Sequence, residues 1–139
     1  MKEKTKQWRI WLIPFAVMIL ILILFREVFM IGYVPTGSME PTIEAGSYVL
    51  GIRKIKDIQT GDIIIFEKDG SYLVKRIAAC GGDEIYHNGQ GLTVPVGCFY
   101  VLGDNAEDSY DSRYWEDPFV EKNQVVAIVV WSYKRAGLR

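Results

Sequence analysis

Histidine and cysteine are scarce in this chain of 139 residues, which has one histidine, His87, and two cysteines, Cys80 and Cys98. These residues cannot form a four-ligand zinc site without carboxylates, and two cysteines exclude a scaffold held by several disulfides. A single histidine also leaves little room for a Ser-His-Asp triad. We therefore expect any nucleophilic chemistry in this protein to use a base other than histidine.

A strong net charge is also missing, because the formal net charge is only −1. The chain has no basic footprint for nucleic acid, and we expect no nucleic-acid partner. Half of the residues are hydrophobic, which excludes a disordered chain, and the length allows at most one ordinary domain.

The charges that are present are unevenly distributed. Residues 1–9 contain four basic side chains and one acidic one, whereas the sixteen residues 10–25 contain no charge. Sixteen helical residues span about 24 Å, which is short of a bilayer core of about 30 Å. The apolar residues 28–31 extend the run if Arg26 and Glu27 reach toward the far interface.

We interpret residues 10–31 as an uncleaved transmembrane anchor. The basic residues before it place residues 1–9 in the cytoplasm, so that residues 32–139 form the extracytoplasmic domain of a single-pass plasma-membrane protein. A cleaved signal peptide and a buried core helix are the alternatives. A small-x-small cleavage site is typical of a signal peptide, and no Ala-x-Ala follows the apolar run.

Residues 32–139 have the pattern of a β domain. Short runs rich in valine, isoleucine and tyrosine alternate with turn residues, and no helical periodicity persists for three turns outside the anchor. Asn88-Gly89 predicts a two-residue hairpin turn, Asp69-Gly70 a second tight turn, and segment 104–120 a long loop. The predicted fold class is mainly β, with a transmembrane helix followed by an antiparallel, barrel-like sheet. The expected strands are Ser47–Arg53, Asp62–Glu67, Tyr72–Ala79, Glu84–His87, Cys98–Leu102 and Val125–Tyr133.

The first candidate for chemistry is Ser38, in the segment YVPTGSMEPT just after the anchor. Pro35 and Pro41 restrict the backbone on either side, and Gly37 permits a turn that leaves the serine hydroxyl and N–H accessible. A rigid turn that presents a serine suits a nucleophile. The commoner alternative is a turn serine that bonds its own backbone.

The second candidate is Lys75, in the segment YLVKRIAA. In a strand it shares one face with Leu73 and Ile77, so it lies among apolar neighbours. Burial disfavours the charged amine and lowers its pKa, and only the neutral amine can take a proton from a serine. The alternative is a lysine whose ammonium reaches solvent at a strand edge.

The third candidate is the polar segment GDNAEDSYDSR, residues 103–113. Asp111 and Arg113 can form a charge-assisted pair that orients their neighbours. A solvated acidic loop and a calcium loop are the alternatives. The spacing does not match the twelve-residue EF-hand pattern, so we expect no metal site.

Taken in order, the anchor, PTGSMEPT, VKRIAACGGD and GDNAEDSYDSR resemble the type I signal peptidases of bacteria, the leader peptidases with a Ser-Lys dyad. The resemblance extends from the anchor to about Val120, with spacing in keeping. It implies that Ser38 is the nucleophile and Lys75 the general base. The other residues that it implies are Thr36 for the oxyanion, Ser109 as the partner of the lysine amine, Asp111 and Arg113 as a supporting ion pair, and Val34, Ile43 and Val74 as the lining of shallow substrate pockets.

The function implied by the resemblance is a membrane-bound serine endopeptidase that removes signal peptides from exported preproteins after Ala-x-Ala sites. It would need no cofactor, and its partners would be preprotein signal peptides, the lipid bilayer and the secretion translocon. Only 27 residues separate Lys75 from Gly103, as in a minimal form without a large cap insertion. The chain departs from the family pattern at Ala106, where an arginine is usual, and at residues 80–83, where L-P-G-D is usual.

Two other functions were weighed against this one. The self-cleaving domain of SOS-response repressors also uses a Ser-Lys pair, but the anchor and the lack of basic charge argue against it. A catalytically inactive, membrane-tethered β module that binds exported chains is the second, and the Ser38–Lys75 pair argues against it. A disulfide between Cys80 and Cys98 at the hairpin base stays open at this point, and His87 is expected to be a surface residue.

Overall fold

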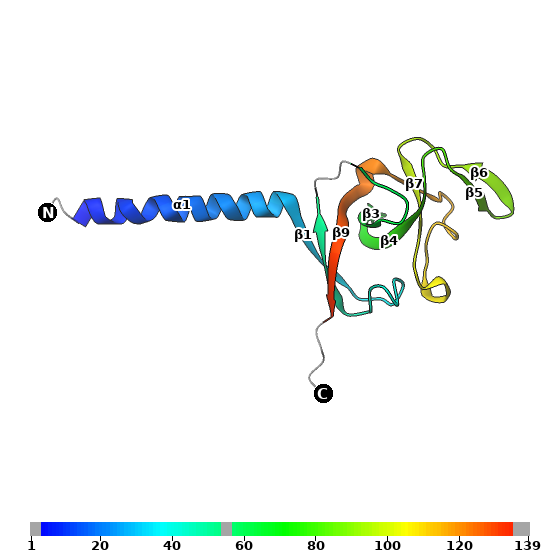
Figure 1. The fold of residues 1–139 in the computed structure, drawn as a ribbon, viewed down its shortest axis with the longest axis horizontal. Helices are drawn as coiled ribbons and strands as arrows, with labels where there is room; N and C mark the ends of the chain where they lie inside the picture. The colour runs from blue at the N-terminus through cyan, green and yellow to red at the C-terminus, as the bar shows by residue number, and fades with distance from the viewer. Residues whose placement is uncertain (1–3, 54–56, 135–139) are drawn as a thin grey trace, which may run out of the picture.

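The computed structural model describes residues 4–53 and 57–134. It begins with one long helix, α1 (Lys4–Val28), which projects from a β domain (Figure 1). Strand β1 (Phe29–Val34) follows α1 without a linker. The helix therefore ends three residues before the predicted anchor boundary at Ile31, because Phe29, Met30 and Ile31 pair with β2 instead of continuing the helix.

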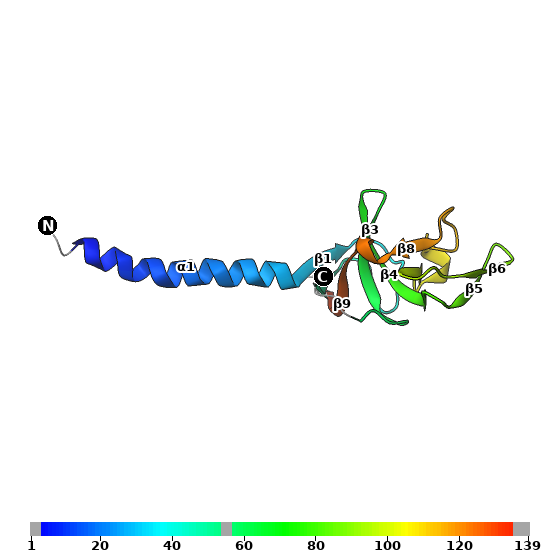
Figure 2. The ribbon, with the colours of Figure 1, turned by 90° about the horizontal axis from the view of Figure 1, so that it is seen from above.

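Residues Ile10–Val28 of α1 are long and apolar enough to cross a membrane by length and composition. Nineteen helical residues span about 28 Å, close to the thickness of a bilayer core. None of this stretch is buried against the β domain, and Figure 2 shows the helix extending away from it. The arrangement argues against the alternative of a buried core helix.

The β domain is built on one antiparallel sheet of seven strands in the order β1-β2-β9-β3-β4-β7-β8. A separate hairpin of β5 and β6 lies at the far end of the domain from α1 (Figure 2). This architecture confirms the predicted mainly β fold class. The remaining elements are β2 (Ser47–Ile52), β3 (Ile63–Lys68), β4 (Ser71–Cys80), β5 (Glu84–His87), β6 (Gln90–Thr93), β7 (Cys98–Leu102), β8 (Phe119–Glu121), β9 (Val125–Lys134) and the short 3-10 helices η1 (Ala106–Asp108) and η2 (Lys122–Gln124).

Each expected strand has a counterpart in the structure, whereas β1, β6 and β8 were not predicted. The two turn predictions agree with the backbone. Asn88 and Gly89 both have positive φ, 50° and 79°, and so do Asp69 and Gly70, at 52° and 75°. Two consecutive positive φ values are the requirement of the two-residue turn that matches the twist of a β-hairpin.

Both faces of the central strands are buried, so the sheet encloses its own core. A first core cluster lies on the face of β4 that carries Ile77, and a second lies on the opposite face, where Val74 packs. The first cluster comprises Ile64, Phe66, Ile77, Phe99, Val101, Trp115 and Val120. The second comprises Val34, Met39, Ile43, Val49, Ile65 and Ala127.

The two cysteines are free and lie on opposite faces of the sheet. Cys80 packs against the first core cluster, whereas Cys98 packs against a third cluster of Ala79, Val94 and Tyr100. Cys80 is the register partner of Phe99, and side chains one residue apart along a strand point to opposite faces. Cβ vectors that point apart cannot be bridged by a disulfide without movement of the backbone.

We therefore predict that the two cysteines remain thiols even in an oxidising compartment. Protein unfolded without reductant should take up two alkylating labels per chain, as measured by mass spectrometry of the intact protein. Unlabelled protein with a mass lower by two hydrogens would contradict the prediction. A Cys98→Ser variant should take up one label, which calibrates the count.

Candidate active site

The turn between β1 and β2 holds Ser38 in a nearly buried position, with 8% of its surface exposed. The turn is closed by a hydrogen bond from the Glu40 N–H to the Gly37 carbonyl. Asn105 fastens it from a distant loop, because its N–H donates to the Ser38 carbonyl at 3.0 Å and its side-chain amide donates to the Gly37 carbonyl at 3.2 Å. Met39 is fully buried in the second core cluster and secures the turn from below.

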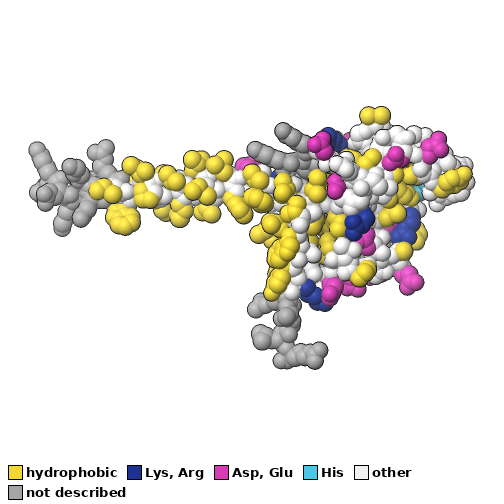
Figure 3. Space-filling model, in the orientation of Figure 1, with side chains coloured by type: hydrophobic (Ala, Val, Ile, Leu, Met, Phe, Trp, Pro, Cys, Tyr) yellow, Lys and Arg dark blue, Asp and Glu magenta, His cyan; other side chains and the backbone are white. Residues whose placement is uncertain are grey.

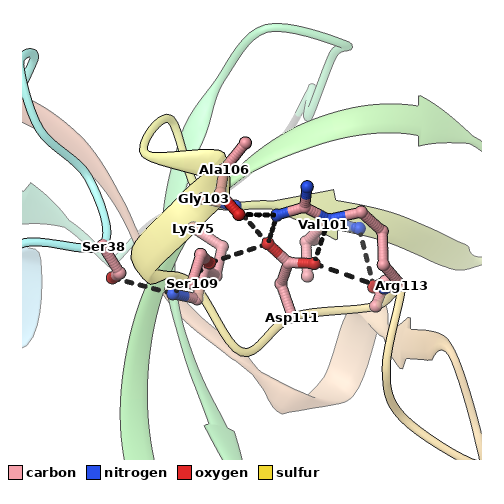
Figure 4. Close-up of polar contacts among 9 residues, drawn as sticks. Ser38, Lys75, Val101, Gly103, Ala106, Ser109, Asp111 and Arg113 are labelled. Atoms are coloured by element: carbon pink, nitrogen blue, oxygen red, sulfur yellow. Dashed lines mark hydrogen bonds and ion pairs between the residues drawn. The ribbon is translucent and has the colours of Figure 1, made fainter.

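Lys75 lies on β4 and is 4% exposed, on the same face as Leu73 and Ile77. Its Nζ lies 2.8 Å from Oγ of Ser38, although 37 residues separate the two along the chain (Figure 4). The alternative of a lysine that reaches solvent is therefore wrong. Strand β4 thus brings the Lys75 amine to the turn that holds Ser38.

Ser109 is the second partner of the lysine amine, with 3.1 Å between Lys75 Nζ and Ser109 Oγ. The Ser109 hydroxyl donates its proton to Oδ2 of Asp111 at 2.7 Å, so it has no proton left to donate to the Lys75 amine. Its oxygen can then only accept from the Lys75 amine. A neutral amine that donates to Ser109 keeps its lone pair free, and the remaining neighbour that can donate to it is the Ser38 hydroxyl.

Asp111 is completely buried and accepts hydrogen bonds from four further groups. These are the Gly103 N–H at 2.9 Å, the Arg113 N–H at 3.3 Å, and the Nε and Nη2 atoms of Arg113 at 2.8 and 2.7 Å (Figure 4). Burial alone raises the pKa of Asp111, but the bonds from Arg113, Gly103 and Ser109 outweigh it and lower the pKa to about 2. Asp111 is therefore a carboxylate at neutral pH.

The pKa of the Lys75 amine is lowered from its ordinary 10.5, chiefly because burial removes water from the charged form. The negative charge of Asp111 opposes this shift, and the positive charge of Arg113 supports it. The Asp111–Arg113 pair thus contributes two opposing effects, and desolvation decides the direction. A larger share of neutral amine is the condition for a lysine base.

Gly103 allows these groups to come together. A Cβ atom at this position would lie 2.1 Å from Oγ of Ser109 and 2.5 Å from the carbonyl oxygen of Ser38. Any side chain at this position would therefore push the Ser109 loop away from the turn that holds Ser38. The sequence pattern assigns no role to Gly103 or Asn105, and the one signal for them is that they lie in a segment dense in small polar residues.

A second ion pair supports the same region from β4. Arg76 forms two hydrogen bonds to Asp104, at 2.8 and 2.6 Å, and also donates to the Gly61 carbonyl at 2.7 Å. It follows Lys75 directly, so its side chain lies on the other face of the strand. The pair ties β4 to the loop that carries Ser109. Sequence reasoning did not assign a role to either residue.

Ser38 and Lys75 open onto a cleft that also exposes Thr36, Leu73 and Ser109. The three residues predicted to line substrate pockets, Val34, Ile43 and Val74, lie together elsewhere, in and against the second core cluster. Thr36, Ser38, Lys75 and Ser109 thus share one cleft, whereas Val34, Ile43 and Val74 lie in or against the core. His87 lies in β5, half-buried beside the ring of Tyr100, and is not among the residues that line this cleft.

Comparison with known proteins gives one consistent result. The family model described as signal peptidase, peptidase S26, matches residues 6–94 and 88–134, which is nearly the whole chain. The chain belongs to the signal peptidase family. The predicted resemblance to the type I signal peptidases of bacteria is thus confirmed.

Individual relatives agree with the family model. The chain is 32% identical over 175 residues to signal peptidase I of Bacillus caldolyticus, covering 95% of this chain and 93% of that protein. It is 30% identical over 144 residues to probable signal peptidase I-2 of Synechocystis sp., covering 76% of this chain and 65% of that protein. It is 34% identical over 90 residues to mitochondrial inner membrane protease subunit 1 of Mus musculus, covering 56% and 54%.

The relatives differ in length from this chain. Its matched part spans slightly less than two thirds of the signal peptidases of Synechocystis sp. and Pseudomonas aeruginosa, at 65% and 63% of their lengths. Within the described residues, 27 positions separate Lys75 from Gly103, and they hold little more than the end of β4, the β5–β6 hairpin and β7.

The contact of Gly103 with Ser38 and Ser109 leads to a stability prediction. Gly103→Ala should lower the thermal midpoint of the detergent-solubilised protein, with a loss of about 1–3 kcal/mol in the free energy of unfolding, as expected for overpacking. Gly91→Ala is the matched control, because its Cβ would meet nothing within 4 Å. Equal midpoints for the two variants would contradict the prediction.

Proposed function

We propose that this protein is a membrane-bound serine endopeptidase that removes signal peptides from exported preproteins, with Ser38 as nucleophile and Lys75 as general base. The observation that carries the proposal is the 2.8 Å separation between Ser38 Oγ and a buried, desolvated Lys75 amine. Membership of the signal peptidase family supports the reaction class. A binding module without activity has no use for a lysine held in an environment that disfavours its charge.

In the acylation step, neutral Lys75 accepts the Ser38 proton as Oγ attacks the scissile carbonyl. The Ser38 N–H and the Thr36 hydroxyl stabilise the oxyanion of the tetrahedral intermediate. Thr36 is exposed and lines the same cleft as the nucleophile, which supports this role. Protonated Lys75 then donates its proton to the leaving amine, and the signal peptide stays attached to Ser38 as an ester.

In the deacylation step, Lys75 takes a proton from a water molecule that attacks the ester. The proton passes to Ser38 Oγ as the ester bond breaks, which regenerates the dyad. Ser109 and Asp111 do not react, but they hold the amine in one orientation through both steps. The mechanism requires no metal or other cofactor.

The substrate would bind as an extended strand beside β4. The first half of that strand, Ser71–Lys75, pairs with β3 on one side only, since its ladder with β7 begins at Arg76. Its other edge has no strand partner among the described residues. A peptide added there gains main-chain hydrogen bonds, and alternate side chains point to one face.

This geometry supports a preference for Ala-x-Ala sites. The side chains on the Val74 face of such a peptide would meet Val34 and Ile43, which are 4% and 2% exposed. There is space for only small side chains above residues that are packed so closely. The first and third positions before the scissile bond would point to this face.

The expected topology completes the proposal. The apolar stretch Ile10–Val28 spans the plasma membrane once, and the basic residues 1–9 keep the N-terminus in the cytoplasm. The β domain is then extracytoplasmic and meets preproteins as they leave the secretion translocon.

Replacement of either dyad residue tests the reaction. Ser38→Ala and Lys75→Ala should each lower kcat/KM by at least about 10³-fold, because the other described residues offer neither group a substitute. The measurement is cleavage of a preprotein by detergent-solubilised protein, with N-terminal sequencing of the product. Ser132→Ala and Lys122→Ala, away from the cleft, should cleave normally. Near-normal turnover by Lys75→Ala would contradict the Ser-Lys mechanism.

The direction of the Lys75 pKa shift predicts the pH dependence. Only the neutral amine is active, so kcat/KM should rise with pH through the lowered pKa of Lys75 and reach its plateau below the ordinary value of 10.5. Asp111 adds no further step near neutrality because its pKa is about 2. A profile that rises between about pH 6 and 7 and is lost in His87→Ala would assign the base to histidine instead.

A further inference from the structure

Tyr110 lies between Ser109 and Asp111, the two residues that orient the catalytic amine. Unlike them it is exposed, at 69%, and it lines the cleft of the active site. Two other rings hold its ring in place. The ring of Tyr114 stacks on it at 6.2 Å, with 12° between the planes, and the ring of Trp115 lies edge-on at 6.4 Å. An exposed ring that is fixed in advance suits the binding of a ligand, because little conformational freedom is lost when the ligand binds.

The proposed binding mode decides which part of the substrate would meet Tyr110. The peptide lies beside the first half of β4, and its first and third side chains before the scissile bond point to the Val74 face. Successive side chains of a strand point to opposite faces, so the second side chain points to the face that carries Leu73 and Lys75. Leu73 and Tyr110 both line the cleft on this face. The middle residue of an Ala-x-Ala site would therefore lie against Tyr110.

This part of the cleft offers an apolar surface to a long side chain. Leu73 is half-buried, and the stacked rings of Tyr110 and Tyr114 are both exposed. The guanidinium of Arg113 already lies over the ring of Tyr114, 5.4 Å from its centroid. The face of a tyrosine ring attracts a cation, so the ring of Tyr110 can accept a second one from a ligand.

Two acidic side chains lie at the same cleft. Glu107 and Asp108 belong to η1, are exposed, and line the cleft together with Tyr110. On the face of the domain shown in Figure 3, acidic side chains lie next to lysine or arginine at several places. Glu107 and Asp108, by contrast, form no ion pair with any residue in the ranges 4–53 and 57–134. Their charges therefore act on the solvent and on a ligand in the cleft.

The basic side chains of this region are engaged with other groups. Arg113 pairs with the buried Asp111. Lys68, in a hollow that adjoins the cleft, lies over the ring of Trp115 at 4.7 Å from its centroid. Lys75 acts in its neutral form in the proposed mechanism. A basic side chain of a substrate would therefore enter a cleft whose own charge is negative.

We propose that Tyr110 and Glu107 form a subsite that selects lysine or arginine at the second position before the scissile bond. The stem of such a side chain packs on Leu73 and on the ring of Tyr110, and its charged end reaches the carboxylates of Glu107 and Asp108. These carboxylates repel an acidic side chain at the same position. The proposal rests on the peptidase activity of the proposed function, and it concerns the residue that a preference for Ala-x-Ala leaves unspecified.

The expected selection is modest, because the contacts are exposed. An exposed ion pair and an exposed cation–π contact each change affinity by a few-fold, so together they should favour lysine over glutamate by about tenfold. Salt at about 1 M screens exposed charges beyond about 3 Å, so the preference should shrink there.

Three preproteins that differ only at this position, with lysine, methionine or glutamate, test the proposal. They are mixed in equal amounts with the detergent-solubilised full chain, and the ratios of kcat/KM are read from the early products by mass spectrometry. We expect lysine to be cleaved about tenfold faster than glutamate and a few-fold faster than methionine. Equal values for the three substrates would overturn the proposal. Methionine cleaved as fast as lysine would overturn it too, because the cleft would then select size and not charge.

Replacement of the two subsite residues tests the assignment. Tyr110→Ala and Glu107→Gln should each bring the ratio of lysine to glutamate cleavage closer to one, and the double variant should bring it to about one. Tyr86→Ala and Glu84→Gln are the matched controls, since both residues are exposed on the distal hairpin, and they should keep the wild-type ratio. Partial unfolding lowers both rates equally and leaves the ratio unchanged. A double variant with the wild-type ratio would overturn the assignment to these residues.

The same assay separates this proposal from the proposed function. Absence of cleavage of all three preproteins by the wild-type protein would overturn the proposed peptidase and the subsite with it. Cleavage of all three at equal rates would overturn the subsite alone and leave the peptidase supported.

Discussion

The withdrawal of the Lys75 amine from water is the constraint on which the site depends. A lysine in water is charged at neutral pH and cannot accept a proton from a serine. At 4% exposure the charged form loses its hydration, and the neutral form becomes accessible. The position on β4 produces this burial, because the residues two places before and after Lys75 belong to or pack against the first core cluster.

The neutral Lys75 amine must also be held in one orientation. The completely buried carboxylate of Asp111 orients it through the Ser109 hydroxyl, which lies between them. Asp111 takes the hydroxyl proton of Ser109, and Ser109 can then only accept from Lys75. Direct contact between Asp111 and the amine would raise the lysine pKa and defeat the burial. The interposed serine keeps the charge at a distance while Arg113 balances it. The arrangement separates the task of orientation from the task of pKa control.

The sheet topology brings these parts together. The turn that holds Ser38 follows β1 at one edge of the sheet, Lys75 lies on the fifth strand in the order, and the Ser109 loop connects β7 to β8 at the other edge. These three segments can meet only if the sheet curls around its core. Two close contacts then hold them together. Asn105 donates to the carbonyls of Gly37 and Ser38, and Gly103 lets the two loops meet without a side chain between them.

Local rules determined a large part of this protein. The apolar run 10–25 predicted a helix that could span a membrane, alternation predicted the central strands, and Asn88-Gly89 predicted a hairpin, because each signal lies within a few neighbouring residues. The motifs around Ser38 and Lys75 likewise indicated the chemistry through their resemblance to a family. The lowered pKa of Lys75 was predicted in direction from strand periodicity alone.

Only the tertiary structure decided where those segments meet. It ended α1 at Val28 in favour of a β1–β2 ladder, and it formed β8 at the end of a segment that reads as a polar loop. It also buried Asp111 completely and brought Ser38 within 2.8 Å of Lys75. These outcomes depend on strand order and on which loop covers which face. Such contacts join residues tens of positions apart, and the local patterns of a sequence do not specify them.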